Sequence, residues 1–343
     1  MKKILLAFVV LVVAAVAAGQ YWLTRAMATA GPNVDTVRVV IPQGASVRVA
    51  LGALVRAGAL SDARPIELYL RFLSNAPRIK NGTYDIAAAA TPRAILAQLA
   101  AGRVVLESLT VIEGWTFAEL RAAVAANTKI RHSLRLSQSD EELMAAIGHA
   151  GLAAEGQFFP DTYRFAEGSG DVEILKLAFD RMQSELAAAW AQRAPDLPLR
   201  NVHELLVLAS VVEKETGLAR ERPQIAGVFI ERLRRNMRLQ SDPTVIYGLG
   251  ARYDGDIRDN DLTTDTPYNT YTRGGLPPTP IALVSRASLQ AVTHPAQDGA
   301  IFFTARGNGD GSSVFTKTYA EHQLAVKKML QEQRASARRP TLR

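Results

Sequence analysis

The longest apolar segment of the chain lies at its amino terminus. Two lysines precede an unbroken apolar run from Ile4 to Gly19, and Tyr21 and Trp22 follow shortly after it. Residues 4–23 supply the roughly 20 positions that a bilayer-spanning helix requires. The lysines favour a cytoplasmic tip at residues 1–3, and the aromatic pair favours the opposite interface. The pattern predicts a single transmembrane helix.

A cleaved signal peptide is the alternative interpretation of the same segment. The small residues from Ala14 to Ala18 offer candidate cleavage positions. The apolar run is longer than the ~7–15 residues of an ordinary signal core, which favours an anchor. Under either interpretation the rest of the chain is exported.

A polar linker at residues 24–35 leads into a predicted β-α-α-β module at residues 36–106. Ser46 caps a helical pattern that ends at Gly58, and Gly82 opens a returning strand. The predicted elements are the strand Thr36–Ile41, the turn Pro42-Gln43-Gly44, the helices Val47–Ala57 and Pro65–Leu73, the strand Gly82–Ile86 and the helix Pro92–Ala101. This is the plan of a small, compact domain.

The pattern of strand, glycine turn, hydroxyl cap and helix then recurs once. Ser108–Ile112 alternates like a strand, Gly114 follows in a turn, and Thr116 caps a helix over Phe117–Ala126. An aromatic segment, Glu155–Tyr163, comes later. This stretch opens a second domain that we place at residues 107–330.

Helical patterns fill the middle of this second domain. Helices are predicted over Val172–Ala194 and from Pro223 to Met237, and between them Val202–Thr216 is the most apolar helix outside the membrane segment. Residues 240–280 are rich in Asp, Asn, Thr, Tyr, Gly and Pro, as binding loops often are. Helices and strands do not alternate strictly, so the fold class expected is α+β rather than a doubly wound sheet.

Composition excludes several kinds of chemistry. The 343 residues include no cysteine, which removes disulfides, thiolate nucleophiles and cysteine zinc sites. The five histidines lack metal-ligand spacing, so we expect neither a metal nor a cofactor. The formal charge of +7 is spread along the chain except for a basic tail at residues 331–343, and we expect no nucleic-acid partner.

Two carboxylates close the apolar helix. Glu213 and Glu215 flank its apolar stripe on opposite sides, with Lys214 between them. A carboxyl held against Leu208 and Val212 is partly desolvated, which raises its pKa and suits it to act as a general acid. Glutamates near helix ends are also often solvated or paired with arginines, and helical geometry alone does not choose between the two.

Long runs in this region resemble the YceG-like (MltG) family of endolytic murein transglycosylases. The resemblance rests on runs in fixed order, among them Leu208–Thr216, Val228–Leu233, Met237–Gly248, Glu155–Thr162, Tyr268–Tyr271, Gly275–Pro278, Pro280-Ile281 and Ala291–Pro295. They extend over most of the chain as far as Tyr319.

The resemblance implies a single-pass inner-membrane protein whose LysM-like module and catalytic domain face the periplasm. It implies that Glu215 is the catalytic residue and that Glu213 supports it. Thr216, the next residue after Glu215, is implied to bind the substrate. Glu215 would protonate the bond between N-acetylmuramic acid and N-acetylglucosamine and then deprotonate the muramoyl C6 hydroxyl, which gives a 1,6-anhydro end. The substrate supplies the nucleophile, so the second carboxylate of ordinary glycosidases is not required.

Polar residues of the long loop are candidate substrate ligands. Gln240, Asn269 and Tyr271 offer hydrogen bonds to a sugar, Tyr247 offers a stacking face, and Asp242 is expected to support them. The same residues also suit a purely scaffolding role, because Asp242-Pro243 and Asn269-Thr270 are good turn sequences.

The sequence is therefore compatible with three functions. The first is a lytic transglycosylase that acts on glycan strands of peptidoglycan and ends their elongation. The second is a lysozyme-type muramidase in which Glu215 works with an aspartate such as Asp242. The third is a non-catalytic, membrane-tethered scaffold that binds the wall. Membrane lipid around the first helix is a further expected partner, and peptidoglycan synthases are candidates.

Overall fold

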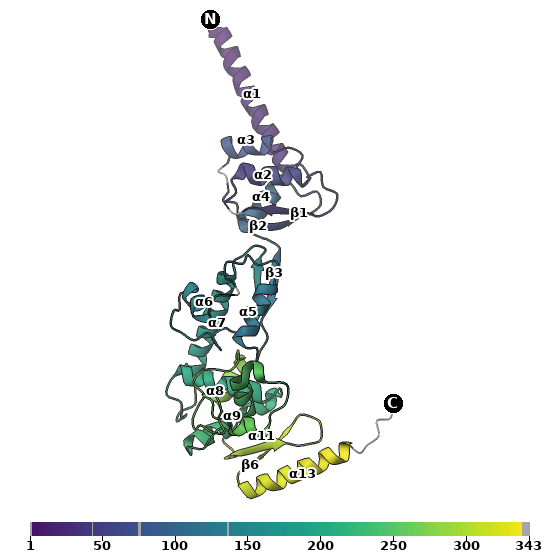
Figure 1. Cartoon of the computed structure of the whole chain (residues 1–343). Coiled ribbons are helices and arrows are strands. Elements are labelled where there is room, and N and C mark those ends of the chain that lie inside the picture. The colour runs from purple at the N-terminus through teal and green to yellow at the C-terminus, as the bar shows by residue number, and fades with distance from the viewer. Residues whose placement is uncertain (1, 43, 75–76, 136, 338–343) are drawn as a thin grey trace. The chain divides into compact units, whose positions relative to one another are not determined.

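The computed structural model describes residues 2–42, 44–74, 77–135 and 137–337, which form two compact units (Figure 1). Unit 1 comprises the described residues within 2–108, 129–131 and 164–169, and unit 2 comprises those within 109–128, 132–163 and 170–337. Gln43 of the predicted turn and residues 338–343 of the predicted basic tail lie outside the described residues.

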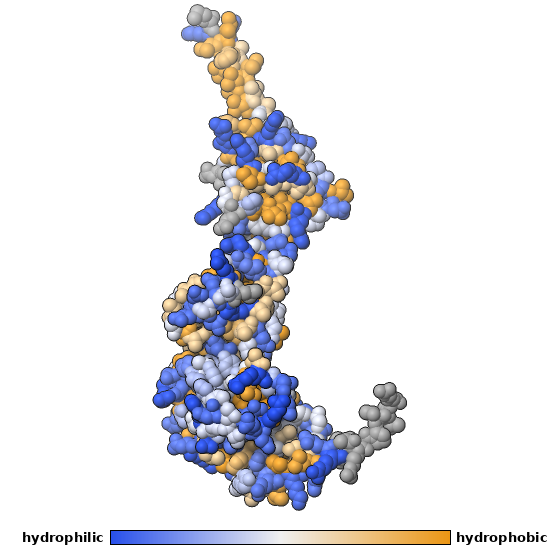
Figure 2. Space-filling model, viewed as in Figure 1, coloured by the Kyte–Doolittle hydropathy of each residue, from blue (hydrophilic) through white to orange (hydrophobic). Residues whose placement is uncertain are grey.

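The first helix, α1, runs from Lys2 to Ala28 and is long and apolar enough to cross a membrane. Its apolar side chains are exposed, and Figure 2 shows them as a nearly continuous hydrophobic surface. The helix continues through residues 24–28, where the sequence predicted a linker. Met27 lies in this continuation, is 2 % exposed and packs in the core of unit 1.

Unit 1 has the expected β-α-α-β order. Its elements are β1 (Val37–Ile41), α2 (Val47–Arg56), α3 (Arg64–Phe72), β2 (Gly82–Ile86) and α4 (Pro92–Ala101). The two strands are antiparallel, with Val37 opposite Ile86 and Ile41 opposite Gly82. The Ser46 hydroxyl accepts a hydrogen bond from the Val49 N–H and caps α2 as predicted. Apolar residues of the helices cover one face of this small sheet.

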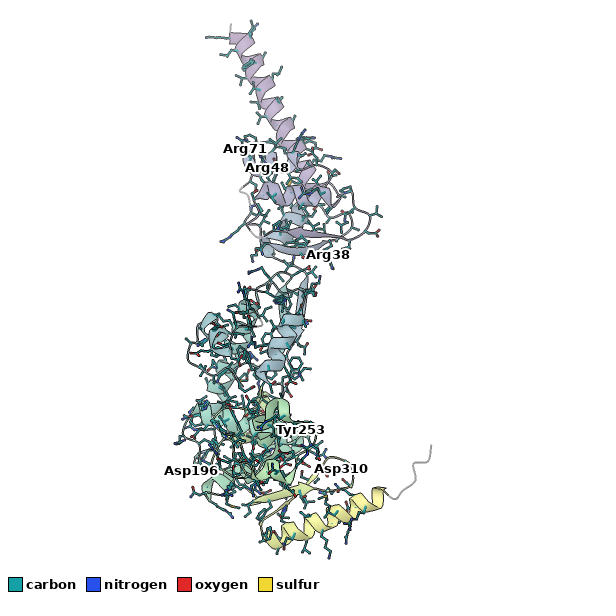
Figure 3. All side chains as sticks on the ribbon, viewed as in Figure 1. Arg38, Arg48, Arg71, Asp196, Tyr253 and Asp310 are labelled. Atoms are coloured by element: carbon teal, nitrogen blue, oxygen red, sulfur yellow. The ribbon has the colours of Figure 1, made fainter. Side chains whose placement is uncertain are left out.

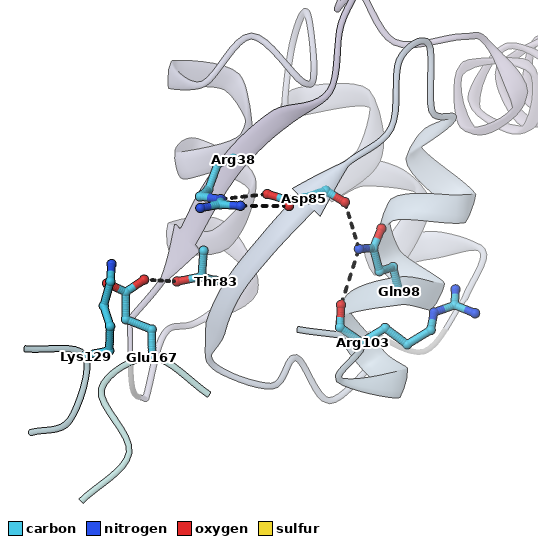
Figure 4. A network of polar contacts seen from close by, with 7 residues as sticks. All are labelled: Arg38, Thr83, Asp85, Gln98, Arg103, Lys129 and Glu167. Atoms are coloured by element: carbon cyan, nitrogen blue, oxygen red, sulfur yellow. Dashed lines mark hydrogen bonds and ion pairs between the residues drawn. The ribbon is translucent and has the colours of Figure 1, made fainter. Parts of the chain in front are cut away.

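Two short segments from later in the chain complete unit 1. Figure 4 shows Glu167 between two partners: its carboxylate accepts a hydrogen bond from the Thr83 hydroxyl at 3.2 Å and pairs with the Lys129 ammonium at 2.7 Å. These contacts hold the pKa of Glu167 below its usual value. On β1 and β2, Arg38 makes a two-pronged ion pair with Asp85.

Unit 2 is mainly helical, and two strand pairs adjoin its helices. β3 pairs with β4, each containing a boundary between the units, and β5 pairs antiparallel with β6. The elements are β3 (Leu106–Thr110), α5 (Phe117–Ala126), α6 (Asp140–Ala146), β4 (Thr162–Ala166), α7 (Asp171–Ala191), α8 (Val202–Glu215), α9 (Arg222–Arg234), α10 (Asp242–Leu249), α11 (Asp259–Thr263), α12 (Arg286–Thr293), β5 (Phe302–Ala305), β6 (Ser313–Thr316) and α13 (Tyr319–Ala337).

Helix α8 lies at the centre of unit 2. Every residue from Leu205 to Glu213 is buried, and helices α7, α9, α10 and α12 pack around it. This explains why its sequence is apolar on nearly every side, since no face meets solvent. The fold is α+β, as predicted.

The long loop contains more helix than the sequence indicated. Residues 242–249 and 259–263 are helical, although the abundance of turn formers predicted irregular structure throughout residues 240–280. Pro243 occupies the first turn of α10, where its missing N–H costs nothing. Helices α6, α12 and α13 were not anticipated either.

Candidate active site

Glu215 occupies the carboxyl end of the central helix. It is the last residue of α8, and Thr216 follows in extended backbone, with φ −143° and ψ 136°. The Thr216 hydroxyl accepts a hydrogen bond from the Leu218 N–H at 3.0 Å and so stabilises the turn that leaves the helix. The helix therefore delivers Glu215 from a rigid core to the start of a loop.

The carboxyl of Glu215 is held by a single described hydrogen bond from a side chain. The Ser241 hydroxyl, fully buried, donates to Oε2 of Glu215 at 2.7 Å. Glu215 itself is half-buried, so part of its carboxyl reaches solvent while the surrounding protein still desolvates it. Desolvation dominates and raises the pKa of Glu215 to about 7. Both protonation states are therefore populated near neutral pH.

Two charged neighbours adjust this pKa in opposite directions. The carboxylate of Asp242 raises the pKa of Glu215 by repulsion, and the buried guanidinium of Arg232 lowers it. Arg232 is fixed by donating to the carbonyl oxygens of Ile301 and Leu239, at 2.8 and 2.5 Å. Its own pKa is lowered by burial.

Glu213 has a different environment, although it precedes Glu215 by only two residues. Its Oε1 pairs with the Arg222 guanidinium at 2.9 Å, and its Oε2 accepts hydrogen bonds from the N–H and hydroxyl of Ser285, at 2.9 and 2.5 Å. Both oxygens are thus engaged, and the side chain is buried. Glu213 joins α8 to the start of α9 and to the cap of α12.

The loop that follows α9 brings Ser241 to Glu215. Gln240 has a left-handed backbone, with φ 49°, and its N–H donates to the Thr270 carbonyl at 3.1 Å. The Ser241 N–H donates to the Thr270 hydroxyl at 3.0 Å. These contacts fix Ser241 while the Gln240 side chain stays exposed.

Asn269 holds the second half of the loop together. It is 1 % exposed, and its amide donates to the carbonyls of Asp261, Leu262 and Thr264. Its side-chain oxygen accepts from the Tyr271 N–H at 2.8 Å. With every polar atom of its amide engaged, Asn269 fits the scaffolding alternative better than that of a sugar ligand.

Tyr271 and Asp242 form a pair beside Glu215. The Tyr271 hydroxyl donates to Oδ1 of Asp242 at 2.6 Å, and burial raises the pKa of the tyrosine. Asp242 is exposed, whereas Tyr271 is half-buried. The Asp242 carboxylate therefore affects the pKa of Glu215, and Glu215 in turn affects the pKa of Tyr271.

Tyr247 is bound to a second carboxyl with a raised pKa, that of Glu155. The Tyr247 hydroxyl donates to Oε2 of Glu155 at 3.1 Å, and the Phe117 N–H donates to Oε1 at 3.0 Å. Burial raises the pKa of Glu155 to about 7. The Tyr247 ring lies 4.8 Å from that of Tyr268, at 63°. Glu155 thus connects the first turn of α5 to α10.

Comparison with known proteins identifies the relatives of this chain. Residues 39–328 match the YceG-like family. A protein of Bacillus subtilis named endolytic murein transglycosylase is 30 % identical over 314 residues, which cover 86 % of this chain and 85 % of the relative. A Streptococcus pneumoniae protein of the same name is 27 % identical and matches 84 % of this chain but only 58 % of its own length.

The chain belongs to the YceG-like family.

A solved structure supports this YceG-like assignment at the level of the fold. The crystal structure of a YceG-like protein from Listeria monocytogenes is 27 % identical, with a TM-score of 0.55. The match covers 84 % of this chain and 99 % of the Listeria chain. The family resemblance predicted from the sequence is confirmed.

The predicted site residues of this YceG-like protein gather around Glu215 only in part. Ser241 donates a hydrogen bond to Glu215 and Arg232 lowers its pKa, yet the sequence pattern singled out neither of them. Glu155 was noted only within a family run. Arg232 comes shortly after the apolar run Ile225–Ile230 of an amphipathic helix, but only the structure shows that it is buried and so needs a partner. Among the described residues no cluster of three histidines or carboxylates is placed to hold a metal.

Proposed function

We propose that this protein is an endolytic murein transglycosylase in which Glu215 acts first as acid and then as base. Its enzyme class, lytic transglycosylase, is the one that the names of its relatives carry. The observation that supports the role of Glu215 is its half-buried carboxyl, with a pKa raised to about 7 and a hydroxyl fixed on one oxygen. A general acid is most effective when its pKa lies near the working pH.

The proposed reaction needs one carboxyl. Protonated Glu215 donates its proton to the oxygen between C1 of N-acetylmuramic acid and C4 of N-acetylglucosamine, and the C1–O bond breaks. The resulting carboxylate takes the proton of the muramoyl C6 hydroxyl, whose oxygen bonds to C1. The products are a 1,6-anhydro end and a free C4 hydroxyl, and Glu215 is protonated again.

The environment of the other carboxylates supports this one-carboxyl mechanism. A retaining or inverting glycosidase uses a second carboxylate as nucleophile or base. Glu213 cannot serve, because both of its oxygens are engaged by Arg222 and Ser285. Asp242 accepts a hydrogen bond from Tyr271 but is exposed. Because its carboxylate is accessible, a muramidase that uses it is the competing hypothesis.

In this proposal α1 anchors the protein in the inner membrane, and unit 1 is a LysM-like module on the periplasmic side. The support is a helix of 27 residues with apolar, exposed side chains, followed by the β-α-α-β order of unit 1. Gln240, Tyr247, Tyr271 and Thr216 stay proposed substrate ligands. Gln240 is exposed and Tyr247 presents a partly open ring, which supports these two.

Mass spectrometry of reaction products tests the proposal. Purified full-length protein and its Glu215→Gln variant are incubated with uncrosslinked glycan strands. Internal 1,6-anhydro ends that appear with the parent and fall by about 10²–10⁴-fold in the variant are the expected result. Reducing ends would establish the muramidase. Absence of cleavage by the parent would leave a wall-binding scaffold.

A further inference from the structure

The helix proposed to span the membrane continues into unit 1 without a break. From Lys2 to Ala28 the backbone is helical, and Met27 near its end is buried among residues of the unit. Its carboxyl end packs against α3 and α4. The orientation of unit 1 relative to α1 is therefore set by packing and not by a flexible tether.

Helix α3 begins beside the interfacial end of α1. Trp22 and Arg25 of α1 line an open cavity of about 370 Å³ together with Pro65 and Ile66 from the first turn of α3. Tryptophan at the end of a spanning helix lies at the level of the lipid headgroups. The start of α3 lies at that same level. Figure 3 shows Arg71, at the other end of α3, on the side of unit 1 from which α1 emerges, whereas Arg38 lies on the far side.

The outward face of α3 alternates positive and large apolar side chains. Arg64, Leu68, Arg71 and Phe72 follow the spacing of one helical face, and all four are exposed. Leu68 is 40 % exposed and Phe72 is 66 % exposed, while Ile66 and Leu70 on the opposite face are buried. We name these four outward residues the α3 stripe.

One further arginine, Arg48, lies near the α3 stripe and is paired with Glu67. A shallow groove of about 460 Å³ is lined by Arg48, Arg64 and Arg71 with Glu67 as its acidic member. Arg48 and Glu67 lie 3.5 Å apart. The Arg71 guanidinium lies 5.5 Å from the centre of the Phe72 ring, so charge and apolar surface are adjacent. Arginine binds phosphate through two parallel N–H donors, and its stem accompanies apolar neighbours into an interface.

We propose that the α3 stripe is a second membrane contact that binds the surface of an anionic phospholipid bilayer. Arg64 and Arg71 pair with lipid phosphates, and Leu68 and Phe72 enter the boundary between headgroups and acyl chains. Anionic lipid is the partner because the α3 stripe starts at headgroup level and carries both the charge and the apolar surface that such lipid offers. This inference rests on the proposed anchoring by α1.

The cysteine-free chain allows a direct test with single fluorescent labels. The full-length protein is inserted in nanodiscs of phosphatidylcholine with and without phosphatidylglycerol. A bimane label is placed in separate variants at Phe72→Cys, at Val40→Cys and at Val12→Cys. Val40, 61 % exposed on β1, serves as the control outside the α3 stripe, and Val12 reports insertion of α1. Quenching by brominated lipid and by aqueous iodide is then measured.

We expect lipid quenching at positions 12 and 72 and iodide quenching at position 40. Adding phosphatidylglycerol should increase lipid quenching at 72. In the labelled Phe72→Cys protein, Arg71→Gln should lower the docked-to-undocked ratio roughly fivefold, as removing one positive charge near an anionic surface does. The matched change Arg38→Gln should leave it unchanged.

Each other outcome overturns a defined part of the inference. Water exposure at 72 with lipid quenching at 12 would reject the second contact and leave the anchor intact. Water exposure at 12 would reject both. Equal effects of Arg71→Gln and Arg38→Gln, or docking that does not depend on phosphatidylglycerol, would reject phosphate as the ligand of the α3 stripe.

Discussion

Glu213 and Glu215 lie two positions apart on one helix, and their surroundings give them different chemistry. Glu213 forms an ion pair with Arg222 through one oxygen and accepts hydrogen bonds from Ser285 at the other. Glu215 has one described side-chain donor and is partly open to solvent. The carboxyl with the raised pKa is the one that can exchange a proton with a substrate.

Removal of the Ser241 hydroxyl should move the pH profile of the enzyme upward. The hydrogen bond from Ser241 stabilises ionised Glu215, so Ser241→Ala should raise the pKa of the acid. The acid must be protonated, so the parent should lose activity above about pH 7. The variant should keep its activity to a pH higher by up to about one unit. The alkaline midpoint of kcat/KM against pH is the measurement, and Ser184→Ala on the exposed face of α7 is the control.

Replacement of Asp242 should have the opposite effect on the same midpoint. The Asp242 charge raises the pKa of Glu215, so Asp242→Asn should lower it and shift the alkaline limb of kcat/KM to lower pH. Shifts of Ser241→Ala and Asp242→Asn in the same direction would contradict Glu215 as the titrating acid. Reducing ends that disappear in Asp242→Asn would instead support the muramidase.

Glu155 should make folding stability depend on pH. Its folded pKa of about 7 lies above that of an unfolded glutamate, so the unfolded state releases the proton first as pH rises. Its contribution to stability is fully present below about pH 4.5 and is lost progressively as pH rises from there to about pH 7. In Glu155→Gln the amide oxygen can still accept from the Phe117 N–H, and the amide NH2 can donate to the Tyr247 hydroxyl, which reverses the direction of that hydrogen bond and removes the titration.

Chemical denaturation of Glu155→Gln and the parent at several pH values tests this. The two free energies of unfolding should be similar near pH 5, and near pH 8 the variant should be more stable by about 3 kcal/mol at most. A difference that does not vary with pH would show that folding does not raise the pKa of Glu155. Tyr247→Phe keeps the carboxyl and should retain the pH dependence.

At the scale of elements, the carboxyl end of α8 is joined to two other helices by an ion pair and by hydrogen bonds, all of them made by Glu213. Glu213 on α8 binds Arg222 at the start of α9 and Ser285 at the cap of α12. Both charged side chains are buried. Buried pairs of this kind contribute little over an apolar substitute but leave an uncompensated charge when one partner is removed.

Arg222→Met should therefore destabilise the protein by about 3–5 kcal/mol. The double variant Glu213→Gln with Arg222→Met should recover part of this loss, because it leaves no buried charge. Urea unfolding measures both. Arg273→Met serves as the control, since its pair with Asp265 is exposed and such pairs are worth about 1 kcal/mol or less. Equal losses in the Arg222 and Arg273 variants would contradict the assignment.

At the scale of the whole molecule, the end of α1 belongs both to the proposed anchor and to unit 1. Met27 is part of the core of unit 1, so the core of this unit begins inside α1 and not in a linker after it. Truncation experiments depend on this boundary.

A chain that starts at Thr24 should lose the anchor, so that high salt releases it from the membrane fraction, and it should keep its thermal stability. A chain that starts at Thr29 lacks Met27 and should be less stable by about 2–5 kcal/mol, the usual range for loss of a buried large apolar side chain. Membrane fractionation and thermal unfolding give the two measurements. Equal stability of the two truncated chains would show that Met27 does not stabilise unit 1, and the full-length protein is the reference for membrane retention.

The sequence by itself determined the family of this protein and part of its local structure, though not helices α6 and α10 to α13. The apolar run of α1, the capped helices of unit 1, the apolar helix α8 and the α+β class all follow from periodicity and capping, which depend on neighbours in the chain. The runs around Glu215 identified the family, which the comparisons confirm.

Only the tertiary structure decided how the two glutamates differ and what surrounds Glu215. Ser241, Arg232 and Ser285 reach the end of α8 from other elements, and a pKa depends on such neighbours and on burial, which sequence spacing does not reveal. The saturation of Asn269 and the burial of Met27 are likewise tertiary facts. Local pattern sets where helices form, and long-range packing sets which of their polar side chains are free to react.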